Sequence, residues 1–169
     1  MTREAKCESE CPIARATFEM GDRWYLLILR ELAMGSRRFD EIWAQTGFSS
    51  HLLSVRLKRL EEDGIIERRK YQDRPARYEY YATPKGEELD GILLQLRAWG
   101  TKWGGYPEAS EPACKLVHKV TGEELDPRGP LPTMEGFSFN DYDATVSPAF
   151  EAERQQRREA FAAKRGKSA

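Results

Sequence analysis

The sequence predicts a mainly α-helical fold of the α+β class, with a two-stranded hairpin and an irregular C-terminal extension. Five segments between residues 12 and 104 repeat apolar residues at helical spacing. Residues 65–82 are rich in β-branched and aromatic residues on both sides of a proline-bearing turn, which is typical of a hairpin. Six of the nine prolines lie in residues 105–148, where they argue against long regular elements.

The first two helices are marked by their end signals. Pro12 suits the first turn of a helix over residues 12–20, and Gly21 ends it. Asp22 is a good N-cap for a second helix, which reaches Ala33. Aliphatic residues recur through this second helix at helical spacing, so we expect it to lie at the centre of the core.

Two further helices follow, separated by a short break. Residues 39–45 have the length and pattern of a helix, and residues 46–48 interrupt it. Ser49 is a good N-cap for the next helix, over residues 50–63. Apolar residues at i, i+4 and i+7 give that helix a buried stripe and leave a polar, partly basic face turned outward. The stripe consists of Leu53, Leu57 and Leu60.

A hairpin and a long helix complete the regular part of the chain. Residues 65–71 and 77–82 have strand propensity and flank a turn at residues 72–76. A helix opens at Pro84 and runs to Gly104. Its apolar stripe is wider than a small domain needs, so we expect it to be a dimerisation helix, partly buried in a partner. The stripe comprises Leu89, Ile92, Leu93, Leu96, Trp99 and Trp103.

The remaining chain differs in character, so we divide the sequence into two domains. Residues 11–104 form the first domain, and residues 105–169 form an extension of unknown role. Within the extension, residues 115–120 and 123–126 suit a small hairpin, and residues 150–164 suit a charged terminal helix. The rest of the extension is expected to be irregular.

The formal net charge of -1 hides an uneven distribution. Residues 68–77 carry five basic residues and one acidic residue, whereas residues 105–153 carry three basic and ten acidic ones. Residues 154–169 are basic again, with six basic residues and one acidic residue. Because nucleic-acid affinity depends on local basic patches, the basic hairpin is more informative than the total charge.

This order of elements is the plan of a winged helix-turn-helix, in which the hairpin is the wing. Small or polar residues near the start of the fourth helix suit contact with base edges in the major groove of double-stranded DNA, and cations at the wing tip suit contact with phosphates. A solvated surface is the alternative for these residues, and for Arg38 it is an equal alternative. The predicted DNA-binding residues are Ser49, Ser50, His51, Ser54, Val55, Lys58, Arg59, Arg74, Arg77 and Arg38.

Residues 11–104 resemble the HxlR family of winged-helix regulators. The matching pieces, in order, are CPIARATFEMGDRWYLLILREL, RRFDEI, LSVRLKRLEEDGIIERRKY and PARYEYYATPKGEEL. The resemblance implies a transcriptional regulator, expected to be a repressor, that binds a pseudo-palindromic operator as a homodimer through its first and last family helices. Proteins similar to this one usually end soon after the long helix, so the resemblance says nothing about residues 105–169.

The resemblance also directs attention to Cys11, because HxlR-like proteins commonly carry a cysteine just before this proline, and in some members it senses oxidants or electrophiles. A helix N-terminus favours the thiolate, which makes a redox role chemically reasonable. Cys7 is close enough in sequence to be a resolving thiol, although Glu8 and Glu10 oppose thiolate formation. A plain reduced thiol is the alternative.

Two other functions are compatible with the same fold. One is a regulator controlled by a small-molecule effector in a cavity at the dimer interface, and another is a winged-helix module that joins proteins without binding DNA. No catalytic constellation is recognisable, so no enzyme and no cofactor are expected. Cys114 and His118 supply only half of a zinc site, so no metal is expected. Without a signal peptide or a long apolar run, we expect a cytoplasmic protein with no membrane partner.

Overall fold

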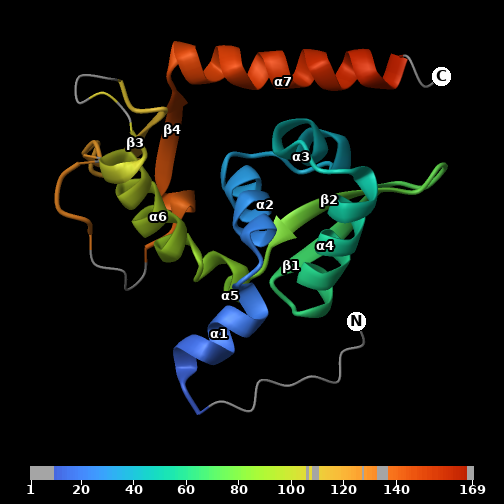
Figure 1. Cartoon of the computed structure of the whole chain (residues 1–169), viewed down its shortest axis with the longest axis horizontal. Coiled ribbons are helices and arrows are strands. Elements are labelled where there is room, and N and C mark those ends of the chain that lie inside the picture. The colour runs from blue at the N-terminus through green and yellow to red at the C-terminus, as the bar shows by residue number, and fades with distance from the viewer. Residues whose placement is uncertain (1–9, 106, 108–110, 127, 133–136, 167–169) are drawn as a thin grey trace.

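The computed structural model describes residues 10–105, 107, 111–126, 128–132 and 137–166. A mainly helical α+β fold with a two-stranded wing is confirmed (Figure 1). In chain order the elements are α1 Pro12–Met20, α2 Arg23–Ala33, α3 Phe39–Thr46, α4 Ser50–Glu62, β1 Ile66–Gln72, β2 Arg77–Ala82, α5 Pro84–Glu87, α6 Asp90–Trp103, β3 Cys114–His118, a 3-10 turn Phe139–Asp141, β4 Tyr142–Val146 and α7 Pro148–Gly166.

Two helices begin at the cap residues that the sequence predicts. At the start of α2, the Asp22 carboxylate accepts a hydrogen bond of 3.0 Å from the Trp24 amide. At the start of α4, the Ser49 hydroxyl accepts one of 3.1 Å from the Leu52 amide. Each side chain satisfies an amide that a helix N-terminus leaves without an intrahelical partner. Both predicted N-caps are therefore confirmed.

The core is built around α2, as predicted. Figure 1 shows α2 between α6 on one side and α3, α4 and the wing on the other, and Ile28 of α2 has no exposed surface. The apolar stripe of α4 faces the same core, because Leu53, Leu57 and Leu60 are at most 2% exposed. Full burial of such side chains stabilises a fold by about 1.5–3 kcal/mol each. The inner face of α4 is thus fixed, and its outer face is left for other contacts.

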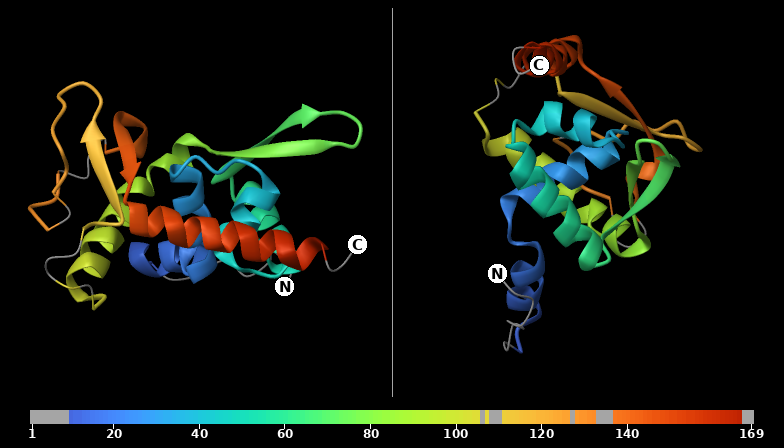
Figure 2. Two further views of the ribbon diagram at one scale, coloured as in Figure 1. Left: turned by 90° about the horizontal axis from the view of Figure 1, so that it is seen from above. Right: turned by 90° about the vertical axis from the view of Figure 1, so that its right-hand side faces the viewer.

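The strands β1 and β2 form an antiparallel hairpin, the wing (residues 66–82), which projects from the body (Figures 1 and 2). Pairing begins with Ile66 opposite Ala82 at the base. Beyond Ile66, the side chains of β1 are exposed or half-buried. The Tyr80 amide donates a 2.8 Å hydrogen bond to the Arg37 carbonyl, so the wing is joined to the segment that precedes α3.

The continuous helix expected over residues 84–104 is two helices, α5 and α6. Gly86 packs so closely on the strand start that an added Cβ would lie 2.2 Å from the Ile65 carbonyl oxygen. The Leu89 amide then bonds the Gly86 carbonyl at 3.1 Å, over three residues in place of four. The helix α5 thus ends after one turn, and α6 begins at Asp90.

The extension has more regular structure than its prolines indicate. β3 pairs antiparallel with β4, beginning with Cys114 opposite Val146. The hairpin expected between residues 115–120 and 123–126 is reduced to a few backbone hydrogen bonds and one isolated bridge to β3. The predicted terminal helix is confirmed as α7. The expectation of an irregular extension was therefore too broad, because the prolines lie between these elements or at their ends.

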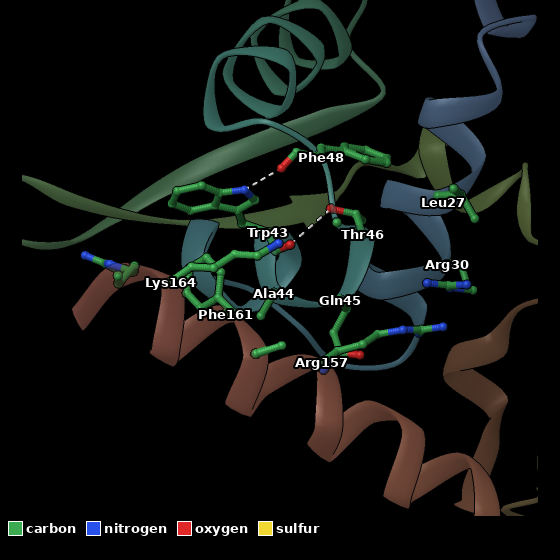
Figure 3. A pocket seen from close by; sticks show the side chains of 13 residues that line it. Leu27, Arg30, Trp43, Ala44, Gln45, Thr46, Phe48, Arg157, Phe161 and Lys164 are labelled. Atoms are coloured by element: carbon green, nitrogen blue, oxygen red, sulfur yellow. Dashed lines mark hydrogen bonds between the residues drawn. The ribbon is translucent and has the colours of Figure 1, made fainter. Parts of the chain in front are cut away.

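The helix α7 lies along α3 and is tied to the body by a buried arginine (Figure 1). The Arg154 guanidinium is 8% exposed and donates hydrogen bonds of 2.9 and 3.1 Å to the two carboxylate oxygens of the fully buried Glu31. The Gln45 amide donates a 3.1 Å bond to the Arg154 carbonyl. Near the other end of α7, the rings of Phe161 and Trp43 meet edge to face at 4.7 Å (Figure 3). The extension thus supports the helix that precedes α4.

Candidate nucleic-acid interface

The outer face of α4 carries the predicted base-reading residues. Ser50, His51, Ser54 and Val55 are all exposed, and so is Lys58 one turn further along the helix. The buried stripe of α4 holds this face outward, and the Ser49 cap fixes where the helix begins. The structure therefore brings these side chains together on one exposed surface near the N-terminal end of α4.

Two residues predicted for the same surface already have partners. The Ser49 hydroxyl is used as the N-cap acceptor. The Arg59 Nε donates a 2.8 Å hydrogen bond to Asp63 Oδ2, one helical turn away, and the Arg59 side chain is 32% exposed. Lys58 differs from Arg59, because its ammonium lies 3.9 Å from Glu62 Oε1 and its side chain is 77% exposed. Of these two cations on α4, Lys58 is therefore the more accessible to a phosphate.

The wing carries its unpaired positive charge at the tip. Arg74 and Arg77 are both exposed, and within the described ranges no carboxylate lies at ion-pair distance from either. The cations nearer the base differ, since each has an acidic partner: Arg68 with Glu61, Arg69 with Glu67 and Lys70 with Asp73. The two predicted wing arginines are thus the ones whose charge is available to a phosphate.

Arg38 lies where α3 meets the wing. Its Nε donates a 3.1 Å hydrogen bond to Glu79 Oε1, and its guanidinium lies 4.6 Å from the centre of the Tyr71 ring. The Tyr81 hydroxyl donates to the other Glu79 oxygen at 2.9 Å. These two hydrogen bonds, first that from Tyr81 and then that from Arg38, lower the pKa of Glu79. Arg38 is therefore an exposed cation held in place by partners from the wing.

Arg56 was not among the predicted site residues, although it helps to position α4. Its Nε lies 2.5 Å from Asp22 Oδ2, and both side chains are about a quarter exposed, 28% and 24%. Asp22 is also the N-cap of α2. The ion pair thus joins α4 to α2, the central helix of the core. Its signal in the sequence was weak, because the two residues lie far apart along the chain.

The cysteines occupy different environments. Cys11 is exposed and is the N-cap residue of α1. Cys7, the expected resolving thiol, lies outside the described residues. Cys114 is half-buried in β3, and burial raises the pKa of its thiol, which opposes thiolate formation. Of the two described cysteines, Cys11 is the accessible one.

The His118 ring makes contacts within the extension. Its ring accepts the Thr121 amide at 3.1 Å and meets the Tyr142 ring edge to face at 5.2 Å. Among the described residues, no three His, Cys, Asp or Glu side chains are grouped so as to hold a metal ion. None of the described helices combines the length and hydropathy of a transmembrane segment.

The three-helix core, the exposed face of α4 and the basic wing define a winged helix-turn-helix protein of the DNA-binding class. Residues 19–107 match the model of the HxlR-like helix-turn-helix family, and the chain belongs to that family. It is accordingly an HTH-type transcriptional regulator, in a family of regulators and not of enzymes.

Relatives and solved structures agree with this assignment. An HTH-type transcriptional regulator of Mycobacterium tuberculosis, Rv3095, is 40% identical over 116 residues, which are 69% of this chain and 72% of the relative. A regulator of Synechocystis, sll1512, is 37% identical over 67% of this chain and 80% of its own. The structure is similar to that of the transcription factor PA1607, with a TM-score of 0.63 and 29% identity over 78% of this chain and 89% of the other.

It is also similar to the oxidised form of HypR, which is described as a redox regulator. That TM-score is 0.51, at 30% identity over 54% of this chain and 96% of HypR. The likeness to PA1607 spans more of the chain than the family match does, so it reaches beyond residues 19–107.

Proposed function

We propose that this regulator represses transcription by binding a pseudo-palindromic operator as a homodimer. The observation that carries the proposal is the pairing pattern on the wing, where Arg74 and Arg77 are exposed and unpaired at the tip while the cations behind them have acidic partners. Phosphate contacts from the wing would set the position of the protein on DNA. Ser50, His51 and Ser54 would then read base edges in the major groove.

Two exposed apolar helices support the homodimer. In α6, Ile92, Leu96, Trp99 and Trp103 fall on one helical face and are 45–64% exposed. No residue of α1 is buried, and Ile13 and Phe18 are 77% and 51% exposed. Figure 2 shows α1 projecting away from the rest of the chain. A second copy of the chain would cover both helices, and apolar patches of this kind commonly mark interaction sites.

We further propose that the two domains have different roles. Residues 11–104 would bind DNA and form the dimer, and residues 105–169 would stabilise the position of the DNA-binding helices. The evidence for this stabilising role is α7, which lies along α3 and is held by the buried pair of Arg154 and Glu31. Because α3 and α4 are separated by only a short turn, a fixed α3 helps to fix α4.

We propose that oxidation of Cys11 is the signal that controls DNA binding. A peroxide would oxidise the Cys11 thiol to a sulfenic acid and release water, and the Cys7 thiol would condense with it to a disulfide and release a second water. The exposure of Cys11 at the start of α1 supports this, as does the similarity to HypR. Since α1 belongs to the proposed dimer interface, oxidation of Cys11 would alter that interface. It would thereby change the position of the two wings relative to each other.

The test is selection of duplex DNA from a random pool by the purified protein, followed by affinity titrations with and without hydrogen peroxide. We expect a two-fold symmetric site with half-sites about one helical turn apart. Peroxide should change the affinity of the wild type and not of Cys11→Ser, with Cys114→Ser as the matched control. Binding without sequence preference would reject the operator, and an equal peroxide effect in Cys11→Ser would reject the sensor.

Two rival functions have distinct outcomes in the same experiment. A regulator controlled by a small molecule would keep its operator affinity in peroxide and lose it on adding its effector, also in Cys11→Ser. A module that joins proteins would recover no DNA site, and removing the charge of Arg74 and Arg77 would leave its partner binding intact.

A further inference from the structure

A cavity of about 420 Å³ lies between the family fold and the extension. Its walls come from α2, α6, β3, β4 and the first turn of α7, and they are mostly apolar. They include Leu26, Leu93, Leu116, Phe139 and Phe150. This volume and this lining are typical of small-molecule sites, which combine an apolar body with a few polar groups.

Arg97 of α6 brings a positive charge into this apolar wall. Its Nη2 donates a 2.7 Å hydrogen bond to the Cys114 carbonyl, which is a neutral acceptor. Among the described residues no carboxylate lies at ion-pair distance from Arg97. Glu111, the acid that lines the same cavity, lies 3.6 Å from Lys115 and is paired there. Burial lowers the pKa of Arg97, as expected for a guanidinium removed from water, and the Cys114 thiol and the Asp126 carboxylate partly oppose this shift from a longer distance.

A partly buried cation with no carboxylate at ion-pair distance is unusual, because removing a charge from water is costly unless an opposite charge compensates it. Two arginines of α7 and α2 show the usual arrangement, since the buried Arg154 and the half-buried Arg30 both have the Glu31 carboxylate beside them. In the cavity, Arg97 is therefore a cation without a directly bonded carboxylate, and an apolar space lies next to it.

We propose that this cavity binds a small hydrophobic carboxylic acid, whose carboxylate pairs with Arg97 and whose apolar body packs against Leu93, Phe139 and Phe150. The guanidinium presents parallel N–H donors that match a carboxylate. The acid would be an effector of the regulator. Only its influence on DNA rests on the proposed function, and its binding does not.

The position of the cavity gives such a ligand a route to the DNA-binding surface. One face of α6 lines the cavity, and the adjoining face carries the exposed stripe of Trp99 and Trp103, with Leu96 belonging to both. Phe150, which also lines the cavity, belongs to α7, which lies along α3. A ligand that contacts both Arg97 and Phe150 would fix α6 relative to α7. It would thereby fix the proposed dimerisation helix relative to the helix that stabilises α3.

The test uses decanoate as the probe, below its micellar concentration, with calorimetry on the full chain. We expect binding to wild type and at least about tenfold weaker binding to Arg97→Gln, because that variant cannot form the charged hydrogen bonds. Arg97→Lys should recover part of the affinity. Lys102→Gln removes an exposed charge from the same helix and should bind within about twofold of wild type. Decanol, which lacks the charge, should bind no better to wild type than to Arg97→Gln.

A second variant blocks the space and leaves the charge. Gly100 lines the cavity, and nothing lies within 4 Å of a Cβ added there, so Gly100→Leu should fold and occupy the space of the ligand. Circular dichroism would verify the fold. We expect this variant not to bind decanoate. No binding to wild type, or equal binding to wild type, Arg97→Gln and Gly100→Leu, would overturn the proposal.

A loss of binding only in Arg157→Gln would also overturn it, since that would place the acid in the groove between α3 and α7 (Figure 3). Operator titrations with decanoate separate the two proposals. Decanoate binding without any selected operator would reject the proposed function and keep the site, whereas an operator without decanoate binding would do the reverse.

Discussion

At the residue scale, Arg74 gives the sharpest test of the wing. If its guanidinium neutralises a phosphate, Arg74→Gln should weaken binding to all DNA sequences alike. The slope of log affinity against log salt should become shallower by about 0.9 for each phosphate that is no longer neutralised. Fluorescence anisotropy over a salt series measures this slope. Lys119→Gln removes an exposed charge from the extension and is the control. An unchanged slope in Arg74→Gln would remove the wing tip from the interface.

Asp90 should make stability depend on pH. Burial raises the pKa of this carboxyl above its ordinary value of 3.8, although the Phe139 amide and the Ser138 hydroxyl bond to it and partly oppose the rise. The stability that this group contributes is therefore greatest below about pH 4 and is lost as the pH rises through the folded pKa.

Asp90→Asn lacks this titration. The melting temperature of Asp90→Asn minus that of wild type should therefore increase as the pH rises from about 4 to 7. This holds whatever the difference is at acid pH. Thermal melts followed by circular dichroism over this pH range measure the difference. Asp141→Asn changes an exposed carboxyl in the 3-10 turn that Asp90 contacts and is the control. A constant difference between Asp90→Asn and wild type would show that Asp90 does not titrate differently in the folded state.

Residue positions were predictable where the signal was local. The exposed face of α4 follows from the spacing of Leu53, Leu57 and Leu60, because a buried stripe dictates the opposite face. The restraint on Arg38 was not predictable, since its partner Glu79 lies 41 residues away on the wing. The lack of a directly bonded carboxylate at Arg97 was hidden for the same reason, because it depends on which segments meet around the cavity.

At the scale of elements, two glycines in helices should respond oppositely to alanine. Gly100 lies within α6, with nothing within 4 Å of an added Cβ, so Gly100→Ala should stabilise the protein by up to about 1 kcal/mol. In Gly86→Ala the new Cβ would lie 2.2 Å from the Ile65 carbonyl oxygen, so the packing of α5 must shift and stability must fall. Urea unfolding measures both free energies. Equal effects in the two variants would contradict this role of Gly86.

The same contrast explains which elements were predictable. The start of α2 and that of α4 are set by Asp22 and Ser49, whose hydrogen bonds join near neighbours in sequence. The break between α5 and α6 lies beside the close contact of Gly86 with Ile65, and the pairing of β3 with β4 spans a long connection. Periodicity detects the first kind of feature and cannot detect the second, because the partner is not in the same window.

At the scale of the whole molecule, the exposed apolar surface is unevenly distributed. Of the nine large hydrophobic residues described as exposed, four lie on one face of α6 and two lie on α1. The helix α4 and the wing lie on the other side of α2 from α6 (Figure 1). Self-association through α1 and α6 would thus leave α4 and the wing free, which is what the proposed symmetric operator requires.

Trp99→Glu tests this arrangement. Trp99 is 64% exposed in the monomer, so a charge there should not disturb the fold. In a two-fold symmetric dimer the interface would bury two such charges, and we expect dimerisation to weaken by about 30-fold or more. Analytical ultracentrifugation measures the dissociation constant. Val120→Glu places the same charge on a side chain that is 88% exposed in the extension, and it should remain dimeric. Operator affinity should fall with the dimer, because one half-site contributes only part of the binding free energy. A Trp99→Glu protein that stays dimeric would move the interface away from α6.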